Sequence, residues 1–429
     1  MNKSNAGTGR ESNGLVCLDL LGHITLGLFI LSVPVFYLNE NLDLKWVSQF
    51  LSLLMIATNS HCLRFRQWHP SMVCLCGICG YFACTAFSGS ETYISGYFMV
   101  YLKFVAVAIW LSLIEWKTSR LIIFVAALAL SSIIVASYSS SDIGDSRLLI
   151  ENNIATDKLN TVRTSGMMAN ANAMGTYSIY AALAGLVLSF YSGRALLISI
   201  VIPCVLSSCY LALYSGSRKA IIGLVILIVY AIWRIGMKNE NFRSNPILAS
   251  ITTLTILAGG MAWLLMNPFA SRFSTDEGSY IARDALILSG LAIWRENPIF
   301  GLGYHGYEQV DVDRLYTHST PVELLSNGGI VACGLYVAFW WYLYRSVRTC
   351  LNVETDLKER SVLLGIGVYI LILFINSLFT VYIEDPIYLV LAAFLCGTLR
   401  HREIELLSKR MRQSQRNSQR RISIHARTI

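Results

Sequence analysis

Apolar segments recur along almost the entire chain and are separated by short polar connections. Most are long enough to cross about 30 Å of hydrocarbon as a helix, and none alternates apolar and polar positions as a lipid-facing barrel strand does. The pattern predicts an all-α fold, a polytopic membrane helical bundle with about 12 transmembrane helices. The expected spans, of which the second is short, lie near residues 15–38, 46–59, 70–88, 92–114, 120–138, 168–191, 195–213, 218–235, 247–266, 322–344, 361–380 and 384–398.

Composition also favours a membrane protein. Of the 429 residues 55% are hydrophobic and only 14% are charged, against about 25% charged in a soluble domain. The first span follows a polar tail, carries Asp19 and His23, and lacks a small-residue cleavage site. We therefore expect an anchor that stays in the protein, and not a removable signal.

Lysine and arginine are distributed unequally between the two sets of loops. With both termini in the cytoplasm, most of the 34 Lys and Arg residues fall on the cytoplasmic side, as the positive-inside rule requires. The net charge of +8 comes largely from the C-terminal tail, which suits anionic membrane lipids and does not indicate nucleic acid. The chain is predicted to begin with a cytoplasmic tail (1–14), followed by helices 1–9 (15–266) and a large, partly helical extracytoplasmic loop (267–321). Helices 10–12 (322–398) and a basic cytoplasmic tail (399–429) complete the predicted order.

The cysteines give no sign of disulfide or metal chemistry. None of the eleven lies in the long outward loops at 139–167 and 267–321, so no disulfide framework is expected. Cys74, Cys76 and Cys79 have the spacing of a metal knuckle, but they lie in an apolar run without His or acidic partners. A packing role is favoured, and the sequence predicts no metal site and no cofactor.

The loop at 267–321 carries structure of its own. Outward loops of this length are usually functional or disordered. Apolar residues at helical spacing predict a helix over 279–297, with its apolar face toward the membrane surface or the bundle, and Pro298 follows. The next residues, GLGYHG, match the pattern G-x-G-x-x-G, but no strand precedes them, so a dinucleotide site is excluded.

The stretch YTHSTPVELLSNGGI leads from this loop into the tenth span. Thr320 at the N-cap, Pro321 and Glu323 predict a capping box that starts the helix. The following glycines are expected to let helices approach closely; they stand at positions 328, 329 and 334. His318 has no such structural role, although a lone histidine here is often only an interfacial polar residue.

Three cations are predicted near His318 on the outer face. Arg218 and Lys219 lie on the side that normally lacks positive charge and at a helix N-terminus, where the macrodipole repels it. Arg283 lies in the loop helix. A bound anion would explain why Arg218 and Lys219 lie on the outer side and at a helix N-terminus. Arginine binds diphosphate through its planar fork. The hypothesis is that the arginines hold a lipid-linked pyrophosphate while a neutral His318 removes a proton from an attacking hydroxyl. The alternative is that each arginine is a solvated cation or a headgroup anchor.

Four blocks of the sequence resemble the O-antigen ligase and polymerase family, membrane enzymes that move undecaprenyl-pyrophosphate-linked glycans on the periplasmic face. The blocks are RTSGMMANANAMG, SGSRKA, RDALILSGLAIWRENPIFGLG and THSTPVELLSNGGIVACG, between about residues 160 and 345. Two positions depart from the family pattern: Ser319 stands where an asparagine is common, and ANAN replaces Asn-Pro-Asn.

The resemblance implies a metal-independent, inverting glycosyltransferase that uses a polyprenyl-pyrophosphate donor. Arg218, Arg283 and His318 correspond to its essential residues and are predicted to be catalytic. The residues expected to bind substrate are Arg163, Asn170, Asn172, Lys219 and Tyr316.

The predicted function is a membrane glycosyltransferase in the bacterial plasma (inner) membrane, with its active site on the periplasmic or outer face. We expect it to pass an undecaprenyl-pyrophosphate-linked glycan to a glycan or lipid acceptor, as an O-antigen or exopolysaccharide polymerase in polysaccharide biosynthesis. An O-antigen ligase to the lipid A-core of lipopolysaccharide stays open. A flippase for the same lipid would need polar residues along the spans, which offer Lys103, Asp19, His23 and little else. A structural subunit of an envelope assembly would not need the predicted site. Other polysaccharide-assembly proteins are expected partners.

Overall fold

The computed structural model describes residues 8–34, 45–64, 68–86, 92–152, 171–215, 217–236, 277–310 and 316–428. Helices make up nearly all of this part of the chain, and it contains no β-strand, only an isolated bridge between Leu63 and Ile114. The helices are α1 (Thr8–Ser32), α2 (Lys45–Asn59), α3 (Pro70–Ala86), α4 (Thr92–Leu113), α5 (Thr118–Asn152), α6 (Ala171–Leu188), α7 (Arg194–Leu196), α8 (Ile202–Tyr214), α9 (Arg218–Gly236), α13 (Glu277–Glu296), α14 (Gly306–Val310), α15 (Thr320–Val353), α16 (Leu357–Leu378) and α17 (Pro386–Thr428).

The fold is that of an all-α membrane protein. Four described helical segments are long and apolar enough to cross a membrane: Thr118–Ser137, Arg194–Tyr214, Thr320–Val353 and Leu357–Leu378. The predicted span at 247–266 lies outside the described residues, and each of the other predicted spans overlaps a helix. The total of about 12 crossings stays a prediction.

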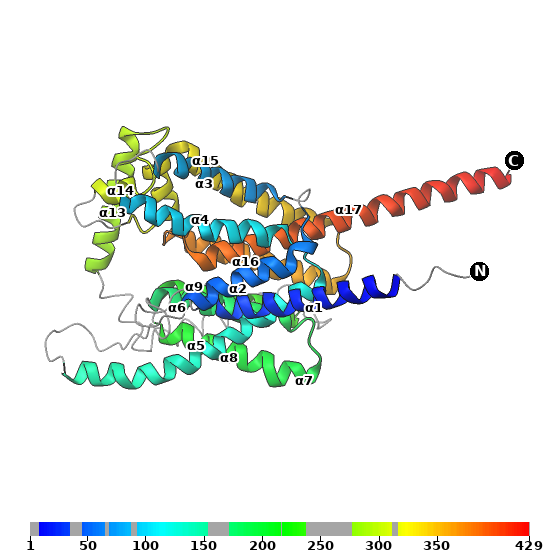
Figure 1. Ribbon diagram of the computed structural model, residues 1–429, viewed down its shortest axis with the longest axis horizontal. Coiled ribbons are helices and arrows are strands. Elements are labelled where there is room, and N and C mark those ends of the chain that lie inside the picture. The colour runs from blue at the N-terminus through cyan, green and yellow to red at the C-terminus, as the bar shows by residue number, and fades with distance from the viewer. Residues whose placement is uncertain are drawn as a thin grey trace.

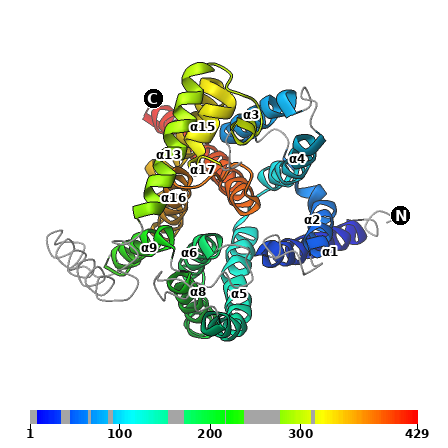
Figure 2. The same ribbon diagram turned by 90° about the vertical axis from the view of Figure 1, so that its left-hand side faces the viewer.

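Most of the helices run side by side along the long axis of the molecule, whereas α13 lies across it (Figure 1), and the end view shows α17 surrounded by its neighbours (Figure 2). The first turns of α17 are buried on every side, including Tyr388 and Phe394, as expected of a helix at the centre of a bundle. The helix then continues out of the bundle, across the predicted boundary at residue 399. Its C-terminal end and the start of α1 lie at one end of the molecule, and α13 and α14 lie at the other (Figure 1).

Helix α5 is longer than predicted because polar residues do not end it. Helix α5 continues to Asn152, so the outward loop expected at 139–167 begins as helix. The helix predicted at 279–297 is confirmed as α13, which packs on α15. Gly290 lets the two elements approach closely, because a Cβ there would lie 2.8 Å from Val322 and 2.9 Å from Thr317.

Helix α15 is interrupted at Gly329, which adopts φ 59° and ψ −160°. The segment after α13 docks into this break: Leu302 N donates to Ser326 O at 2.9 Å, and Gly303 N donates to Asn327 O at 2.8 Å. These bonds satisfy carbonyl groups that the broken helix frees. A Cβ on Gly329 would lie 2.2 Å from the Ile299 carbonyl oxygen.

The tenth helix was predicted to be uninterrupted, with glycines at the contacts between helices. The break at Gly329 shows that this prediction was wrong. Gly329 serves the docked loop, and a Cβ on Gly334 would meet no atom within 4 Å. Gly328 alone fits the prediction in part, since a Cβ there would lie 3.4 Å from Tyr81 of α3. The interruption places the 298–310 segment against the beginning of α15.

Candidate active site

A cavity of about 440 Å³ opens at the end of the bundle that carries α13 and α14. This volume is in the range of roughly 300–1,000 Å³ that is usual for small-molecule sites. The cavity lies between the starts of α6, α9, α15 and α17, one face of α13 and the loop around α14. Its lining residues are Asn172, Ala173, Lys219, Arg283, His305, Glu308, Tyr316, His318, Glu323, Asn327, Phe379, Thr380, Val381, Tyr382, Glu384, Asp385 and Pro386.

Five predicted site residues from four separate segments line this one cavity: Asn172, Lys219, Arg283, Tyr316 and His318. Arg218, the first residue of α9, is described by the structure but does not line it. Arg163 and Asn170 lie outside the described residues. The structure therefore brings Lys219, and not Arg218, to the cavity beside Arg283 and His318.

His318 is held in an unusual backbone conformation next to the cations. Its φ of 59° lies in the left-handed region, which costs a non-glycine residue free energy and is common at functional sites. The ring packs on Tyr316, with centroids 4.3 Å apart. Burial, and then the positive charges of Arg283 and Lys219, lower the pKa of His318 below its usual value. The imidazole is therefore neutral near pH 7 and able to accept a proton.

Close packing between two sequence blocks positions Lys219. Gly175 in α6 allows the turn before α9 to approach, because a Cβ there would lie 2.4 Å from Ser215 Oγ and 2.9 Å from both Ser217 and Ala220. The Lys219 ammonium lies 5.8 Å from the centre of the Tyr382 ring. This contact holds the side chain over the connection between α16 and α17.

The capping box predicted for α15 is wrong. Ser319 is the N-cap and makes no side-chain capping bond. Thr320 Oγ1 instead donates to Thr380 O at 2.6 Å and accepts from Tyr382 N at 3.0 Å. Glu323 accepts from Thr317 N at 2.9 Å and from Asn327 Nδ2 at 2.7 Å. These residues thus join three segments of the cavity wall.

A second charged group in the cavity consists of His305, Glu308 and Glu384. The Nδ1 of His305 lies 2.7 Å from Glu308 Oε2, and its Nε2 lies 3.2 Å from Glu384 Oε2. Sequence reasoning missed this group because Glu384 is distant in the chain. The one local signal was the pair of residues His305 and Glu308, three positions apart after a glycine-rich turn.

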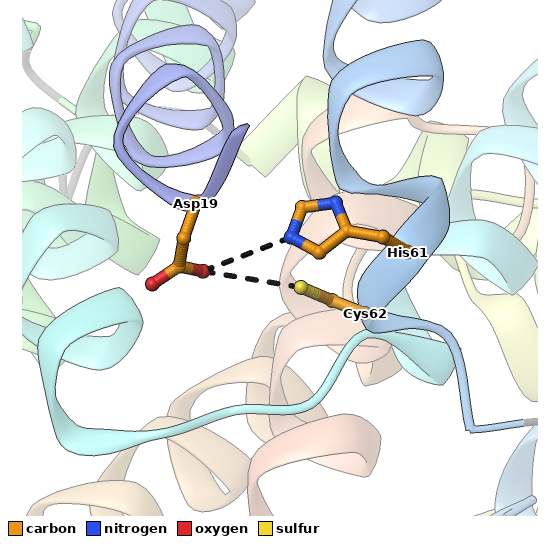
Figure 3. A group of neighbouring side chains, drawn as sticks. All are labelled: Asp19, His61 and Cys62. Atoms are coloured by element: carbon orange, nitrogen blue, oxygen red, sulfur yellow. Dashed lines mark hydrogen bonds and ion pairs between the residues drawn. The ribbon is translucent and has the colours of Figure 1, made fainter. Parts of the chain in front are cut away.

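Another cluster, outside the cavity, contains side chains that could ligate a metal. Asp19, His61 and Cys62 have potential ligand atoms within 4.8 Å of one another (Figure 3). The sequence predicted no such cluster, since its members come from α1 and the turn after α2. The buried Arg120 guanidinium donates to Asp19 and lies 2.8 Å from Cys62 Sγ. Its positive charge competes with a metal cation for these ligands.

Comparison with known proteins gives one family. Residues 202–337 match the family model described as O-antigen ligase. No curated protein matches the chain. The matched segment contains the blocks SGSRKA, RDALILSGLAIWRENPIFGLG and THSTPVELLSNGGIVACG. These blocks include Lys219, Arg283 and His318 of the cavity. Over residues 202–337 the chain is therefore similar to the O-antigen ligase family, the family that its sequence blocks resemble.

Proposed function

We propose that the protein is a glycosyltransferase that transfers a glycan from undecaprenyl pyrophosphate to an acceptor hydroxyl. The observation that carries the proposal is the meeting of Arg283, Lys219 and a neutral His318 at one cavity. The family match supports an O-antigen ligase or polymerase type of membrane enzyme.

Arg283 and Lys219 bind the pyrophosphate of the donor. Both are cations at the cavity, and both act electrostatically on His318. Pyrophosphate is the leaving group and gains negative charge as its bond to the sugar breaks. Fixed cations therefore stabilise the transition state more than the ground state, which accelerates the reaction without a requirement for a metal.

His318 acts as the general base. The acceptor hydroxyl oxygen forms a bond to the anomeric carbon while the bond from this carbon to the pyrophosphate oxygen breaks. The hydroxyl proton passes to the imidazole, and the polyprenyl pyrophosphate leaves with the bonding electrons. A single displacement of this kind inverts the anomeric configuration. Proton removal by a positioned base contributes typically about 10²- to 10⁴-fold in rate.

The acceptor is proposed to be a second lipid-linked glycan, which makes the protein a polysaccharide polymerase. A ligase to lipid A-core uses the same donor chemistry and differs only in the acceptor. With both termini cytoplasmic, the cavity faces the outer side of the plasma membrane, because α13 and α14 lie at the end opposite the end of α17. Arg218 is proposed to support this site from the start of α9, one residue from Lys219.

Glycan transfer by the purified protein in EDTA tests the proposal. A pyrophosphate-linked oligosaccharide is the donor, and His318→Ala and Arg283→Ala are compared with the parent at matched folded levels. Arg295→Ala is the control, since this arginine is exposed on the same helix and does not line the cavity. We expect losses of at least about 100-fold in the two site variants and none in the control.

Full activity of both site variants would overturn the proposed site. If EDTA abolishes the activity of the parent, the proposal of a metal-independent reaction is overturned. Product length then separates the two acceptors, because a polymerase forms a ladder of repeats and a ligase adds one glycan to each acceptor.

A further inference from the structure

His305, Glu308 and Glu384 line the cavity but have no part in the chemistry above. Each ring nitrogen of His305 faces a carboxylate, at 2.7 Å for Glu308 and 3.2 Å for Glu384. Although burial opposes the charge, hydrogen bonds to these two carboxylates raise the pKa of His305 to about 10. The ring is thus an imidazolium that donates both N–H groups, so it can neither accept a proton nor donate one to a ligand. It holds the two carboxylates at a fixed spacing.

The backbone around His305 is arranged to keep this geometry. His305 has a φ of 53°, in the left-handed region that non-glycine residues rarely adopt. Asn327 holds the chain on both sides of it: its carbonyl oxygen accepts from Gly303 N at 2.8 Å, and its Oδ1 accepts from Tyr307 N at 2.7 Å. A strained residue that is fixed from both sides indicates a preorganised site.

The two carboxylates retain capacity for a ligand. Their side chains are 27% and 34% exposed, for Glu308 and Glu384 respectively, and both line the cavity. Each carboxylate has about four lone-pair sites, of which the imidazolium uses only a part. With one positive and two negative charges the group is a net anion. It therefore suits hydroxyl donors and repels a second carboxylate or a phosphate.

This group lies next to the proposed base. The charge of Glu308 acts on the Tyr316 hydroxyl, and the Tyr316 ring packs on His318 at 4.3 Å. The cations Arg283 and Lys219 act on His318 as well. The cavity thus contains His318 together with a cationic group that suits pyrophosphate and an anionic group that suits hydroxyls. An acceptor hydroxyl must approach His318 for its proton to be removed.

We infer that Glu308 and Glu384, held apart by His305, bind the hydroxyl groups of the acceptor sugar and select an uncharged sugar over a uronic acid or a sugar phosphate. This inference rests on the proposed function, since it assigns the second substrate of the same site. Glu308 and Glu384 are binding residues for the acceptor, and His305 is a positioning residue that acts through them.

Binding of small glycosides to the full chain in lipid nanodiscs tests the inference. The probes are the methyl glycosides of glucose, galactose and mannose and the methyl glycosides of their uronic acids, which replace the C6 hydroxymethyl group by a carboxylate. Competition in saturation-transfer NMR gives the ratio of affinities within each pair. We expect at least one neutral glycoside to bind at least about tenfold more tightly than its uronide.

Glu308→Gln and Glu384→Gln each remove one negative charge at nearly constant shape and should reduce this ratio to less than about threefold. Glu296→Gln is the matched control, because Glu296 is exposed at the end of α13 and does not line the cavity; it should keep the ratio of the parent. The inference is overturned if the parent binds neither member of any pair, if it binds both equally, or if the preference survives in both site variants. Binding of Mn²⁺ that Glu384→Gln abolishes would overturn it in favour of a cation site.

Titration with farnesyl pyrophosphate separates this inference from the proposed function. Its binding should be lost in Arg283→Ala and kept in Glu384→Gln. If the parent does not bind farnesyl pyrophosphate, the proposed donor site fails, whatever the glycosides do. If it binds the pyrophosphate and shows no preference among glycosides, only the acceptor assignment fails.

Discussion

Helix α17 passes two groups of charged side chains that are organised in different ways. The cavity group contains Arg283 and Lys219, and the paired group contains Arg120 and Asp19. It begins at the cavity, where Asp385 caps it by accepting from Tyr388 N at 3.0 Å. Farther along, Arg402 lies 3.3 Å from Thr118, two residues before the buried Arg120. The rise of a helix from Pro386 to Arg402 is roughly 24 Å, so one rigid element connects both groups.

The cations in the two groups differ in their partners. Arg120 is fully buried and donates to the Asp19 carboxylate, and its second amino group donates to Glu115 O at 3.0 Å. In the part of the chain that the structure describes, neither Arg283 nor Lys219 forms an ion pair with a carboxylate. A cation with its own anion ties helices together, whereas cations that face a cavity without one leave room for an anion from outside.

The geometry of the cavity depends on the break in α15, so a substitution at Gly329 should have the largest effect on glycan transfer. In Gly329→Ala the new Cβ would meet the Ile299 carbonyl at 2.2 Å, and the φ of 59° is strained for alanine. The docked loop must then shift, and misplacement by about 1 Å can cost about 100-fold in rate. We therefore expect glycan transfer to fall at least about 100-fold, measured at matched folded levels. Gly334→Ala is the control, because it has open space; an equal loss there would contradict the explanation.

Asp19→Asn tests the paired cation and should affect stability but not chemistry. Because Arg120 is fully buried, loss of the carboxylate leaves it without its counter-ion. Because the Asp19 side chain is 45% exposed, the cost is smaller than the roughly 3 kcal/mol that is typical when a fully buried pair is broken. The thermal unfolding midpoint in detergent should drop, while transfer activity per folded molecule stays that of the parent. Asp284→Asn, at an exposed carboxylate of α13, should change neither quantity. An unchanged midpoint for Asp19→Asn would show that Arg120 does not depend on this partner.

The contrast between the groups also shows what sequence patterns can predict. Helix α13 was predicted because apolar spacing is local. Lys219 was predicted because a cation at an outer helix start conflicts with the macrodipole, and His318 because helix capping gave it no structural role. Arg283 was predicted because it lies in the loop helix on the same face. The convergence of Glu384 on His305 could not be predicted, since no local pattern connects the two residues.

Two errors have one physical cause. The capping box at Thr320 and the continuous helix through Gly329 were inferred from local preferences, and tertiary contacts override both. Thr320 bonds to the connection before α17, and the carbonyls of Ser326 and Asn327 bond to the loop after α13. The pattern of glycines did mark the place, but it did not distinguish helix contact from a docked loop.

His305→Asn should weaken the fold in a pH-dependent manner, with a smaller effect than that of Asp19→Asn. Asparagine tolerates the left-handed conformation but cannot bridge both carboxylates. The folded-state pKa is raised to about 10, above the unfolded value of about 6.5. The stabilisation is therefore fully present below pH 6.5 and is lost as the pH rises through 10.

Thermal midpoints of the parent and His305→Asn, measured across this pH range, give the test. The difference between them should be largest at the acidic end and should shrink toward pH 10. A constant difference would mean that His305 is not charged in the folded protein. Glu296→Gln should show no difference from the parent at any pH.

The smallest expected effect concerns the cations and the base. Lys219 lowers the pKa of His318, together with burial and Arg283. Lys219→Gln should therefore raise this pKa only part of the way toward its usual value, because burial and Arg283 remain. Transfer requires the neutral imidazole, so the acidic limb of the profile of kcat/KM against pH should move to higher pH.

The position of that limb is the readout, since the loss of a pyrophosphate contact also lowers the height of the profile. Lys358→Gln, which removes a lysine that contacts Tyr191 away from the cavity, should leave the limb in place. If the limb stays fixed in Lys219→Gln, or moves to lower pH, Lys219 does not lower the pKa of His318. Arg283 would then be the cation that keeps His318 neutral.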